Sequence, residues 1–144
     1  MKKVIFSADK IVMNAGLSNK EEAISLAGRL LVQGGHVTDS YIQKMFEREE
    51  LMTTYIGNGV AIPHGTNESK AFIKSSGISI VQVPGGVDFG NGNIAYLVIG
   101  IAGIGDEHLE ILSNIAIACS EEENVKKLVQ AATQEEIIEI LERG

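Results

Sequence analysis

Residues 94–102 have the sequence Ile-Ala-Tyr-Leu-Val-Ile-Gly-Ile-Ala, which is apolar at both alternating sets of positions. A strand that faces water on one side alternates apolar and polar residues, whereas a strand covered on both faces does not. We therefore expect a central strand here, with a helical layer on each face of its sheet. The chain then turns at Gly103-Ile104-Gly105, and Asp106-Glu107 begins a helix with acidic residues at its positive end.

The rest of the chain carries signals for further strands and helices. Short apolar runs predict strands at residues 11–14, 53–55, 60–62 and 78–83, the last closed by Pro84-Gly85-Gly86. Capping residues and helical spacing predict helices that begin at Ser18 (paired with Glu21), Thr38, Asn67, Ser120 and Thr133. These elements predict a single-domain α/β sandwich over residues 1–144, with a mixed four- to five-stranded sheet covered by helices on both faces.

The helix expected from Asp106 carries two apolar stripes, which predict that most of its surface is buried. One stripe is formed by Leu109, Leu112, Ala116 and Cys119, and the other by Ile111, Ile115 and Ala118. Cys119 is the only cysteine of the chain, which excludes an internal disulfide and a multi-cysteine zinc site. Its position in an apolar stripe indicates a core residue.

The composition is that of an acidic globular protein. Of the 144 residues, 44% are hydrophobic and 22% are charged, and the net charge of −7 argues against nucleic-acid phosphates as the main ligand. Residues 75–144 carry 11 of the 19 acidic residues but 3 of the 12 basic ones, which favours a basic partner. The longest apolar run, residues 94–104, is shorter than the roughly 20 residues of a membrane span. No signal peptide is recognised, so we expect a cytoplasmic protein.

Residues 59–66, Gly-Val-Ala-Ile-Pro-His-Gly-Thr, place a histidine directly after a predicted strand. Pro63 cannot donate to a β-ladder, so the strand should end just before His64. Gly65 permits close backbone approach, and Thr66 is placed to cap a short helix whose free amides would point back toward the imidazole. A nucleophilic imidazole beside such amides suits a phosphoryl group, with Gly65 and Thr66 as phosphate-binding residues. An ordinary loop histidine is the alternative.

The other two histidines lie in different contexts. His108 also follows a predicted strand at the start of a helix, and if the two strands are neighbours, His64 and His108 meet at one edge of the sheet. A helix-start histidine that bonds locally is the alternative for His108. His36 lies in a helix–helix loop and is expected to be solvated. The histidines with Asp106 or Glu107 match no metal-ligand spacing, so no metal site is predicted.

Three segments carry a resemblance to a known family: Phe46-Glu47-Arg48-Glu49, residues 57–66, and Glu107-His108-Leu109. They resemble the EIIA components of the bacterial phosphoenolpyruvate-dependent sugar phosphotransferase system, of the mannitol/fructose type, and most of all its mannitol-specific members. The similarity runs from about residue 9 to residue 143 with the elements in the same order. The resemblance implies a single type-2 EIIA domain over residues 1–144.

The resemblance also implies an activity, that of a phosphotransferase with a phosphohistidine intermediate. His64 would accept a phosphoryl group at Nε2 from the phosphohistidine of the small carrier protein HPr. It would then pass the group to a cysteine of the EIIB domain of a membrane sugar permease. His108 matches the family's second active-site histidine, and Arg48 matches its nearby arginine. Transfer between two histidines needs alignment and charge stabilisation, and no cofactor is implied.

One position departs from the family pattern. Mannitol-type members commonly carry an acidic residue where this chain has Asn58. In this respect the chain also resembles the nitrogen-regulatory EIIA branch. The favoured function is mannitol uptake and phosphorylation, and the alternative is a regulatory EIIA whose phosphorylation state controls a non-sugar partner.

Overall fold

Five strands form one mixed sheet in the structure, a computed structural model that describes residues 8–143. The strands are β1 (Ile11–Val12), β2 (Tyr55–Gly57), β3 (Val60–Ala61), β4 (Gly77–Asp88) and β5 (Ile94–Ala102). The helices are α1 (Lys20–Gln33), α2 (Ser40–Leu51), α3 (Asp106–Cys119), α4 (Glu122–Gln130) and α5 (Gln134–Arg143), with short 3-10 helices η1 (Ala8–Lys10) and η2 (Asn67–Phe72). Within residues 8–143, none of the helices has the length and apolar character needed to cross a membrane.

Strand β5 lies at the centre of the sheet, whose order is β1-β4-β5-β3-β2. It pairs antiparallel with β4 and parallel with β3, while β1 pairs parallel with β4 and β2 antiparallel with β3. The turn between β4 and β5 covers residues 89–93, where the N–H of Phe89 donates to the carbonyl of Asn93 at 2.8 Å. The predictions of a central strand at 94–102 and of a mixed sheet are confirmed.

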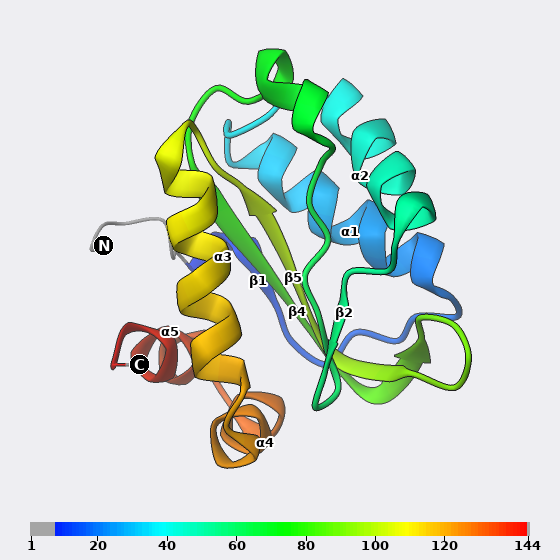
Figure 1. The fold of residues 1–144 in the computed structure, drawn as a ribbon. Helices are drawn as coiled ribbons and strands as arrows, with labels where there is room; N and C mark the ends of the chain where they lie inside the picture. Colours follow the sequence, from blue (N-terminus) through cyan, green and yellow to red (C-terminus); the bar gives the residue numbers. More distant parts are fainter. Residues whose placement is uncertain (1–7, 144) are drawn as a thin grey trace.

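Helices cover both faces of the sheet (Figure 1). Helices α1 and α2 pack on one face, in a core that includes Val98 and Ala102 of β5. Helices α3, α4 and α5 pack on the other face, in a core that includes Leu97, Ile99 and Ile101. Successive residues of β5 point alternately into two apolar cores, which explains why this strand has few polar positions. The predicted α/β sandwich is confirmed.

The prediction that Pro84-Gly85-Gly86 closes the fourth strand is wrong, because β4 continues to Asp88. The pairing of β4 with β5 shifts register across this segment, so it forms an irregular stretch inside the strand. Gly86 has a φ of 81°, which glycine adopts without strain. β1 pairs with β4 only before this segment, so no neighbouring strand on that side needs the N–H that Pro84 lacks.

The first helix begins two residues later than Ser18. Asn19 is its N-cap, and the Asn19 Oδ1 accepts a hydrogen bond from the N–H of Glu22 at 2.9 Å. The Glu22 carboxylate accepts in turn from the N–H of Ser18 at 2.7 Å. The reciprocal cap therefore exists, but it uses Asn19 and Glu22 in place of the predicted Ser18 and Glu21.

The capping residues expected further along the chain have mixed outcomes. The predicted cap at Thr133 is confirmed, since its Oγ1 accepts from the N–H of Glu136 at 3.2 Å at the start of α5. Ser120 does not cap α4. Its hydroxyl donates to the carbonyl of Ile117 at 2.8 Å at the end of α3, and α4 begins at Glu122.

Helix α3 is buried on one face only, so the prediction of two buried stripes is wrong. Leu109 is 68% exposed and Ile117 is 62% exposed. The buried residues of the helix are Ile111, Ile115, Ala118 and Cys119. Because α3 lies on the outside of the sandwich, only the side that faces the sheet is covered (Figure 1). The prediction that Cys119 is a core residue is confirmed, and burial raises the pKa of its thiol to about 11.

Candidate functional site

His64 lies just beyond the end of β3 and beside the end of β5. The carbonyl oxygen of Pro63 accepts a hydrogen bond from the N–H of Ile101 at 3.0 Å, so the chain after β3 keeps following β5. His64 itself forms an isolated parallel bridge with Ile101. The residue is 7% exposed. It therefore occupies the edge of the sheet at which the two parallel strands end.

The backbone determines which nitrogen of His64 is free. The Nδ1 atom lies 2.8 Å from the carbonyl oxygen of Ile62. A carbonyl oxygen can only accept, so Nδ1 carries the proton of this hydrogen bond. A neutral imidazole has one ring proton, which leaves the lone pair on Nε2. The ring is thus held in the tautomer whose nucleophilic atom is Nε2.

Burial keeps the ring of His64 neutral. Loss of water disfavours the charged ring and is the main cause that lowers the pKa of His64 from 6.5 to about 4. The charges of Arg48 and His108 lower this pKa further, whereas the hydrogen bond to Ile62 and the charge of Glu49 raise it. At neutral pH the imidazole is therefore uncharged and able to act as a nucleophile.

The lowered pKa of His64 predicts a loss of stability in acid. The unfolded chain binds a proton at this histidine near pH 6.5 and the folded chain only near pH 4, so stability falls as the pH drops through this window. Between pH 7 and pH 4 we expect the wild-type protein to lose on the order of 2 kcal/mol more than His64→Gln, whose residue 64 does not titrate. Urea unfolding at both pH values measures the difference, and equal losses in the two proteins would contradict the prediction.

His108 lies in the first turn of α3 and faces His64. The centroids of the two rings are 5.4 Å apart, and the ring planes are inclined by 57°. The close approach depends on Gly103, because a Cβ there would lie 2.4 Å from the Cα of His108. Burial lowers the pKa of His108, so this ring is also mainly neutral at pH 7. The prediction that the two histidines meet at one sheet edge is confirmed.

The segment after His64 is held by a buried tyrosine. The N–H of Gly65 donates to the hydroxyl of Tyr41 at 2.8 Å, and this hydroxyl donates to the carbonyl of Ile101 at 2.8 Å. A Cβ at residue 65 would lie 2.6 Å from the Tyr41 ring and 2.5 Å from the Oγ of Ser69, so glycine is required. Burial raises the pKa of Tyr41 to about 12, which keeps its hydroxyl protonated as both bonds require.

Thr66 does not cap a helix with its side chain. η2 is a six-residue 3-10 helix, and Thr66 makes no side-chain cap bond to it. The Thr66 Oγ1 is shielded from solvent and has no hydrogen-bond partner within the described chain. Thr66 lines a cavity of about 310 Å³ together with His108 and Lys70. An imidazole and an ammonium group are both suited to contact the oxygens of an anion, whereas the Thr66 hydroxyl is shielded from the cavity in this structure.

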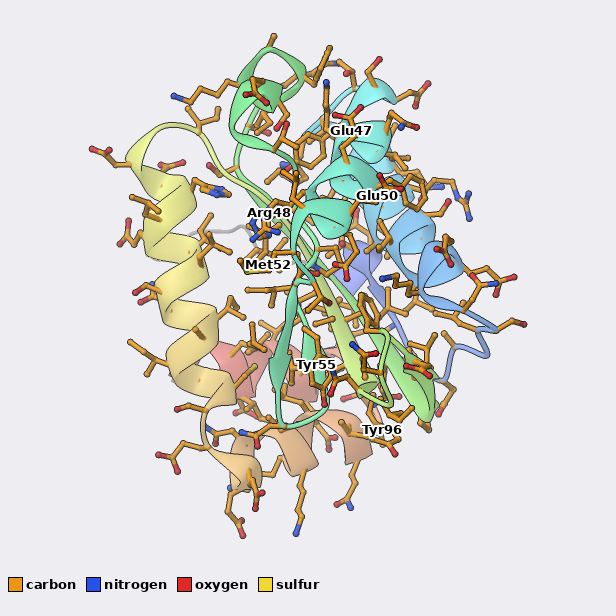
Figure 2. The ribbon with its side chains drawn as sticks, turned by 45° about the vertical axis from the view of Figure 1, so that its right-hand side comes forward. Glu47, Arg48, Glu50, Met52, Tyr55 and Tyr96 are labelled. Atoms are coloured by element: carbon orange, nitrogen blue, oxygen red, sulfur yellow. The ribbon has the colours of Figure 1, made fainter. Side chains whose placement is uncertain are left out.

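Arg48 lies in the last turn of α2 and is half-buried. Its Nη1 donates to the carbonyl oxygen of Met52 at 2.6 Å. Figure 2 shows Arg48 directed from α2 toward the side of the molecule on which α3 lies, with Met52 beside it. The effect of its charge on His64 agrees with this placement. The predicted set of His64, His108 and Arg48 thus comes together.

Two residues close to this site were not singled out from the sequence as functional. Nothing in the spacing of Tyr41 predicts its bond to Gly65. Glu49 is 5% exposed and shares the buried face of α2 with Tyr41 and Met45. The sequence does contain a signal for Glu49. Tyr41, Met45 and Glu49 are spaced four residues apart and so share one helix face, and a carboxylate is unusual on a face that is otherwise apolar and buried.

The expectation that His36 is solvated is wrong. Its Nε2 lies 2.6 Å from the Nζ of Lys10 and its Nδ1 lies 2.9 Å from the Oγ of Ser75. Gly77 makes room for the ring, because a Cβ there would lie 2.4 Å from it. The loop after α1 is thereby fixed to the start of β4, which a local sequence pattern does not reveal.

Asn58 lies at the far end of β3 from His64. Its side-chain amide donates to the carbonyl oxygens of Cys119 and Ser120, at 3.0 and 3.2 Å, at the C-terminal end of α3. His108 lies at the opposite end of this 14-residue helix, which is about 21 Å long at 1.5 Å per residue. Asn58 therefore stabilises a helix end and does not contact the histidine pair. Among residues 8–143, no cluster of three or more His, Cys, Asp or Glu side chains is suited to a metal ion.

Comparison with known proteins assigns the chain to a family. Residues 4–144 match the family described as "Phosphoenolpyruvate-dependent sugar phosphotransferase system, EIIA 2". The chain is 62% identical over 137 residues to the mannitol-specific phosphotransferase enzyme IIA component of Geobacillus stearothermophilus, covering 95% of this chain and 94% of that protein. The protein of the same name from Bacillus subtilis is 54% identical over 136 residues, with 94% and 95% covered.

The fold leads to the same class of protein. The complex of enzyme IIAMTL and phosphorylated enzyme IIBMTL from Escherichia coli contains a chain that matches with a TM-score of 0.90 and 37% identity, covering 96% of this chain and 97% of that one. The protein is a phosphotransferase component of sugar transport. The chain belongs to the EIIA 2 family of the phosphoenolpyruvate-dependent sugar phosphotransferase system.

Proposed function

We propose that this protein is the EIIA component of a mannitol phosphotransferase system and that His64 carries the phosphoryl group. One observation carries the proposal. The bond from Nδ1 of His64 to the Ile62 carbonyl at 2.8 Å leaves Nε2 unprotonated, in a ring whose centroid is 5.4 Å from that of His108. A neutral, oriented imidazole with its lone pair directed away from the backbone is the group that phosphoryl acceptance requires.

In the first step, the lone pair on Nε2 of His64 attacks the phosphorus of phosphorylated HPr. The new Nε2–P bond forms as the N–P bond of the donor histidine breaks, and the donor ring keeps that electron pair. The proton on Nδ1 stays in its hydrogen bond to Ile62, so no proton has to leave the site. The bond made and the bond broken are of one kind, and the step therefore depends mainly on alignment.

In the second step, a cysteine thiolate of the EIIB domain attacks the same phosphorus. An S–P bond forms, the Nε2–P bond breaks, and the lone pair returns to Nε2. The group carries two negative charges on a protein whose net charge is −7, so local compensation is needed. Arg48, His108 and Thr66 are the residues that we assign to the phosphoryl oxygens. Gly65 contributes indirectly, because its N–H is bonded to the Tyr41 hydroxyl and its lack of a Cβ leaves room for the Tyr41 ring and the Oγ of Ser69.

The surface around the site supports docking of two protein partners in turn. Leu109 on α3 is 68% exposed, and Ile104 in the loop before α3 is 46% exposed. Leu51 and Met52, at the end of α2 that carries Arg48, are 77% and 68% exposed. Apolar side chains exposed around a polar centre are typical of interaction sites. We assign this surface to HPr and to the EIIB domain.

Mannitol is the sugar that the similarity favours, because relatives at 62% and 54% identity bear a mannitol-specific name. The regulatory alternative was motivated by Asn58, whose amide binds the end of α3 and does not reach the histidine pair. The position is therefore weak support for a regulatory role. We assign residues 1–144 to a single EIIA domain. We further propose that the protein acts in the cytoplasm, as a component of a sugar phosphotransferase system.

Reconstitution of sugar phosphorylation tests the proposal. Phosphoenolpyruvate, enzyme I, HPr, this protein and membranes that contain the matching mannitol EIIB–EIIC permease are combined with labelled mannitol. We expect mannitol phosphate to form only when all components are present, because each phosphoryl transfer needs its own acceptor.

Labelled fructose with the same membranes is the control for specificity. Phosphorylation of this protein by HPr without any mannitol phosphate would support the regulatory alternative. Failure of HPr to phosphorylate the protein at all would refute both functions.

A further inference from the structure

Glu49 is a buried carboxylate next to the candidate site. It is 5% exposed and lies on the buried face of α2, one residue after Arg48. A buried carboxylate is costly unless its oxygens are hydrogen-bonded. The hydrogen bonds that satisfy the Glu49 carboxylate are the first of a series that leads to His64.

Three contacts hold the Glu49 carboxylate. Its Oε1 accepts from the N–H of Thr54 at 2.8 Å and from the hydroxyl of the same threonine at 2.7 Å. Its Oε2 lies 3.4 Å from the Nζ of Lys20 on α1. Thr54 is itself 3% exposed, so the pair is shielded from water. Glu49 thus fixes the segment that leads from α2 into β2.

A series of hydrogen bonds connects this carboxylate to the imidazole. The carbonyl oxygen of Thr54 accepts from the N–H of Ile62 at 3.0 Å. The carbonyl oxygen of Ile62 accepts from Nδ1 of His64 at 2.8 Å. Each step joins two groups of the buried backbone or side chains, so a displacement of Thr54 moves Ile62 and changes the acceptor that orients the ring.

A separate bond holds the arginine. Arg48 donates through Nη1 to the carbonyl of Met52 at 2.6 Å, two residues before Thr54 (Figure 2). Met52 is itself bonded to the end of α2, where its N–H donates to the carbonyl of Arg48 at 3.3 Å. The arginine is therefore held by its own helix end, whereas the bonds of Glu49 lead to His64.

We infer that Glu49 is a positioning residue, which acts through Thr54 and Ile62 to keep His64 in the Nδ1–H tautomer. The inference rests on the proposed role of His64 as phosphoryl acceptor. In this role Glu49 acts as a hydrogen-bond acceptor. Its negative charge is paired with the ammonium group of Lys20 at 3.4 Å. A glutamine at this position keeps an acceptor oxygen, whereas an alanine keeps none.

The experiment compares Glu49→Gln, Glu49→Ala and the matched control Glu50→Ala. Glu50 is an exposed carboxylate on the outer side of the same helix (Figure 2). Long-range proton–nitrogen NMR spectra give the tautomer of His64 directly, without any phosphoryl donor. Initial rates with phosphorylated HPr at varied concentration separate kcat from KM.

We expect Glu49→Gln and Glu50→Ala to keep the Nδ1–H tautomer and a kcat within about threefold of wild type. In Glu49→Ala we expect the Nε2–H tautomer to appear and kcat to fall by about ten- to a hundredfold, with little change in KM, because a misplaced nucleophile slows the transfer more than it weakens docking. A role confined to stability would leave the tautomer and the kcat of the folded fraction unchanged.

A folded Glu49→Ala protein with the wild-type tautomer and kcat would overturn the inference. So would a Glu49→Gln protein as impaired as Glu49→Ala, since charge and not hydrogen bonding would then be decisive. If Glu49→Ala does not fold, Thr54→Val removes one of the two donors to Oε1, and its spectrum decides in the same way. Failure of the proposed function is distinguishable, because a wild-type protein that HPr does not phosphorylate still reports its tautomer.

Discussion

Replacing His64 by alanine is expected to abolish phosphorylation by HPr. The variant lacks the Nε2 lone pair, and the neighbouring groups that we assign to the phosphoryl oxygens contain no replacement in the same position. We expect the rate of formation of acid-labile phosphate to fall by at least about a thousandfold, because removal of a nucleophile leaves only binding and electrostatic contributions. The variant is incubated with phosphoenolpyruvate, enzyme I and HPr. Detection of phosphohistidine on the variant itself then measures the effect.

His36 offers the matched control for this experiment. It is a half-buried histidine whose ring bonds to Lys10 and Ser75 and does not face His108. His36→Gln should therefore be phosphorylated at close to the wild-type rate, while circular dichroism verifies that both variants are folded. Phosphohistidine that persists in His64→Ala would assign the reaction to another residue and would remove the basis of the mechanism.

Replacing His108 by alanine is expected to slow the transfer by about a hundredfold, since loss of one group that stabilises developing charge on a transferred group typically costs this much. The effect should appear in kcat, because the ring is assigned to the phosphoryl oxygens and not to the partner surface. Rapid-quench measurement of transfer from phosphorylated HPr gives the rate. The backbone should tolerate the change, because the close contact with Gly103 involves the Cα, N and Cβ of His108, all of which alanine retains.

Stability measurements separate this effect from unfolding. His108 is half-buried and we expect its loss to change the unfolding free energy by less than about 1 kcal/mol. A His108→Ala protein that transfers phosphate as fast as wild type would show that the 5.4 Å contact between the rings has no catalytic role. A variant that is slow only because it is unfolded would show instead that His108 is structural.

Local patterns in the sequence were sufficient for the central strand and the two-sided helical cover, whereas the meeting of His64 and His108 was predicted only on the condition that their strands are neighbours. The first two depend on residues close together in the chain, and the histidines follow strands whose ends are marked by proline and glycine. The order of the strands depends on long-range pairing and did not follow from such patterns. The length of β4 did not follow from local patterns either. The strand continues through Pro84-Gly85-Gly86 because its neighbour β1 ends before this segment.

The errors at individual side chains have a common physical origin. His36 was expected in water because its partners Lys10 and Ser75 are 26 and 39 residues away along the chain. The outer face of α3 was expected to be covered because apolar spacing does not distinguish a core face from a surface that serves protein partners. Glu49 was not identified as a site residue because its link to His64 runs through main-chain groups, which no residue type signals.

Residues 89–93 form the turn that joins the antiparallel strands β4 and β5. This turn lies at the end of β5 that is opposite to His64 and His108. The nine residues of β5 span about 30 Å at roughly 3.3 Å each, so this turn is remote from the reactive imidazole. Asn91 at its tip is exposed and has a φ of 56°. A fluorophore or a fused reporter attached there stays clear of incoming carriers, which makes this turn a suitable handle for following their association in real time.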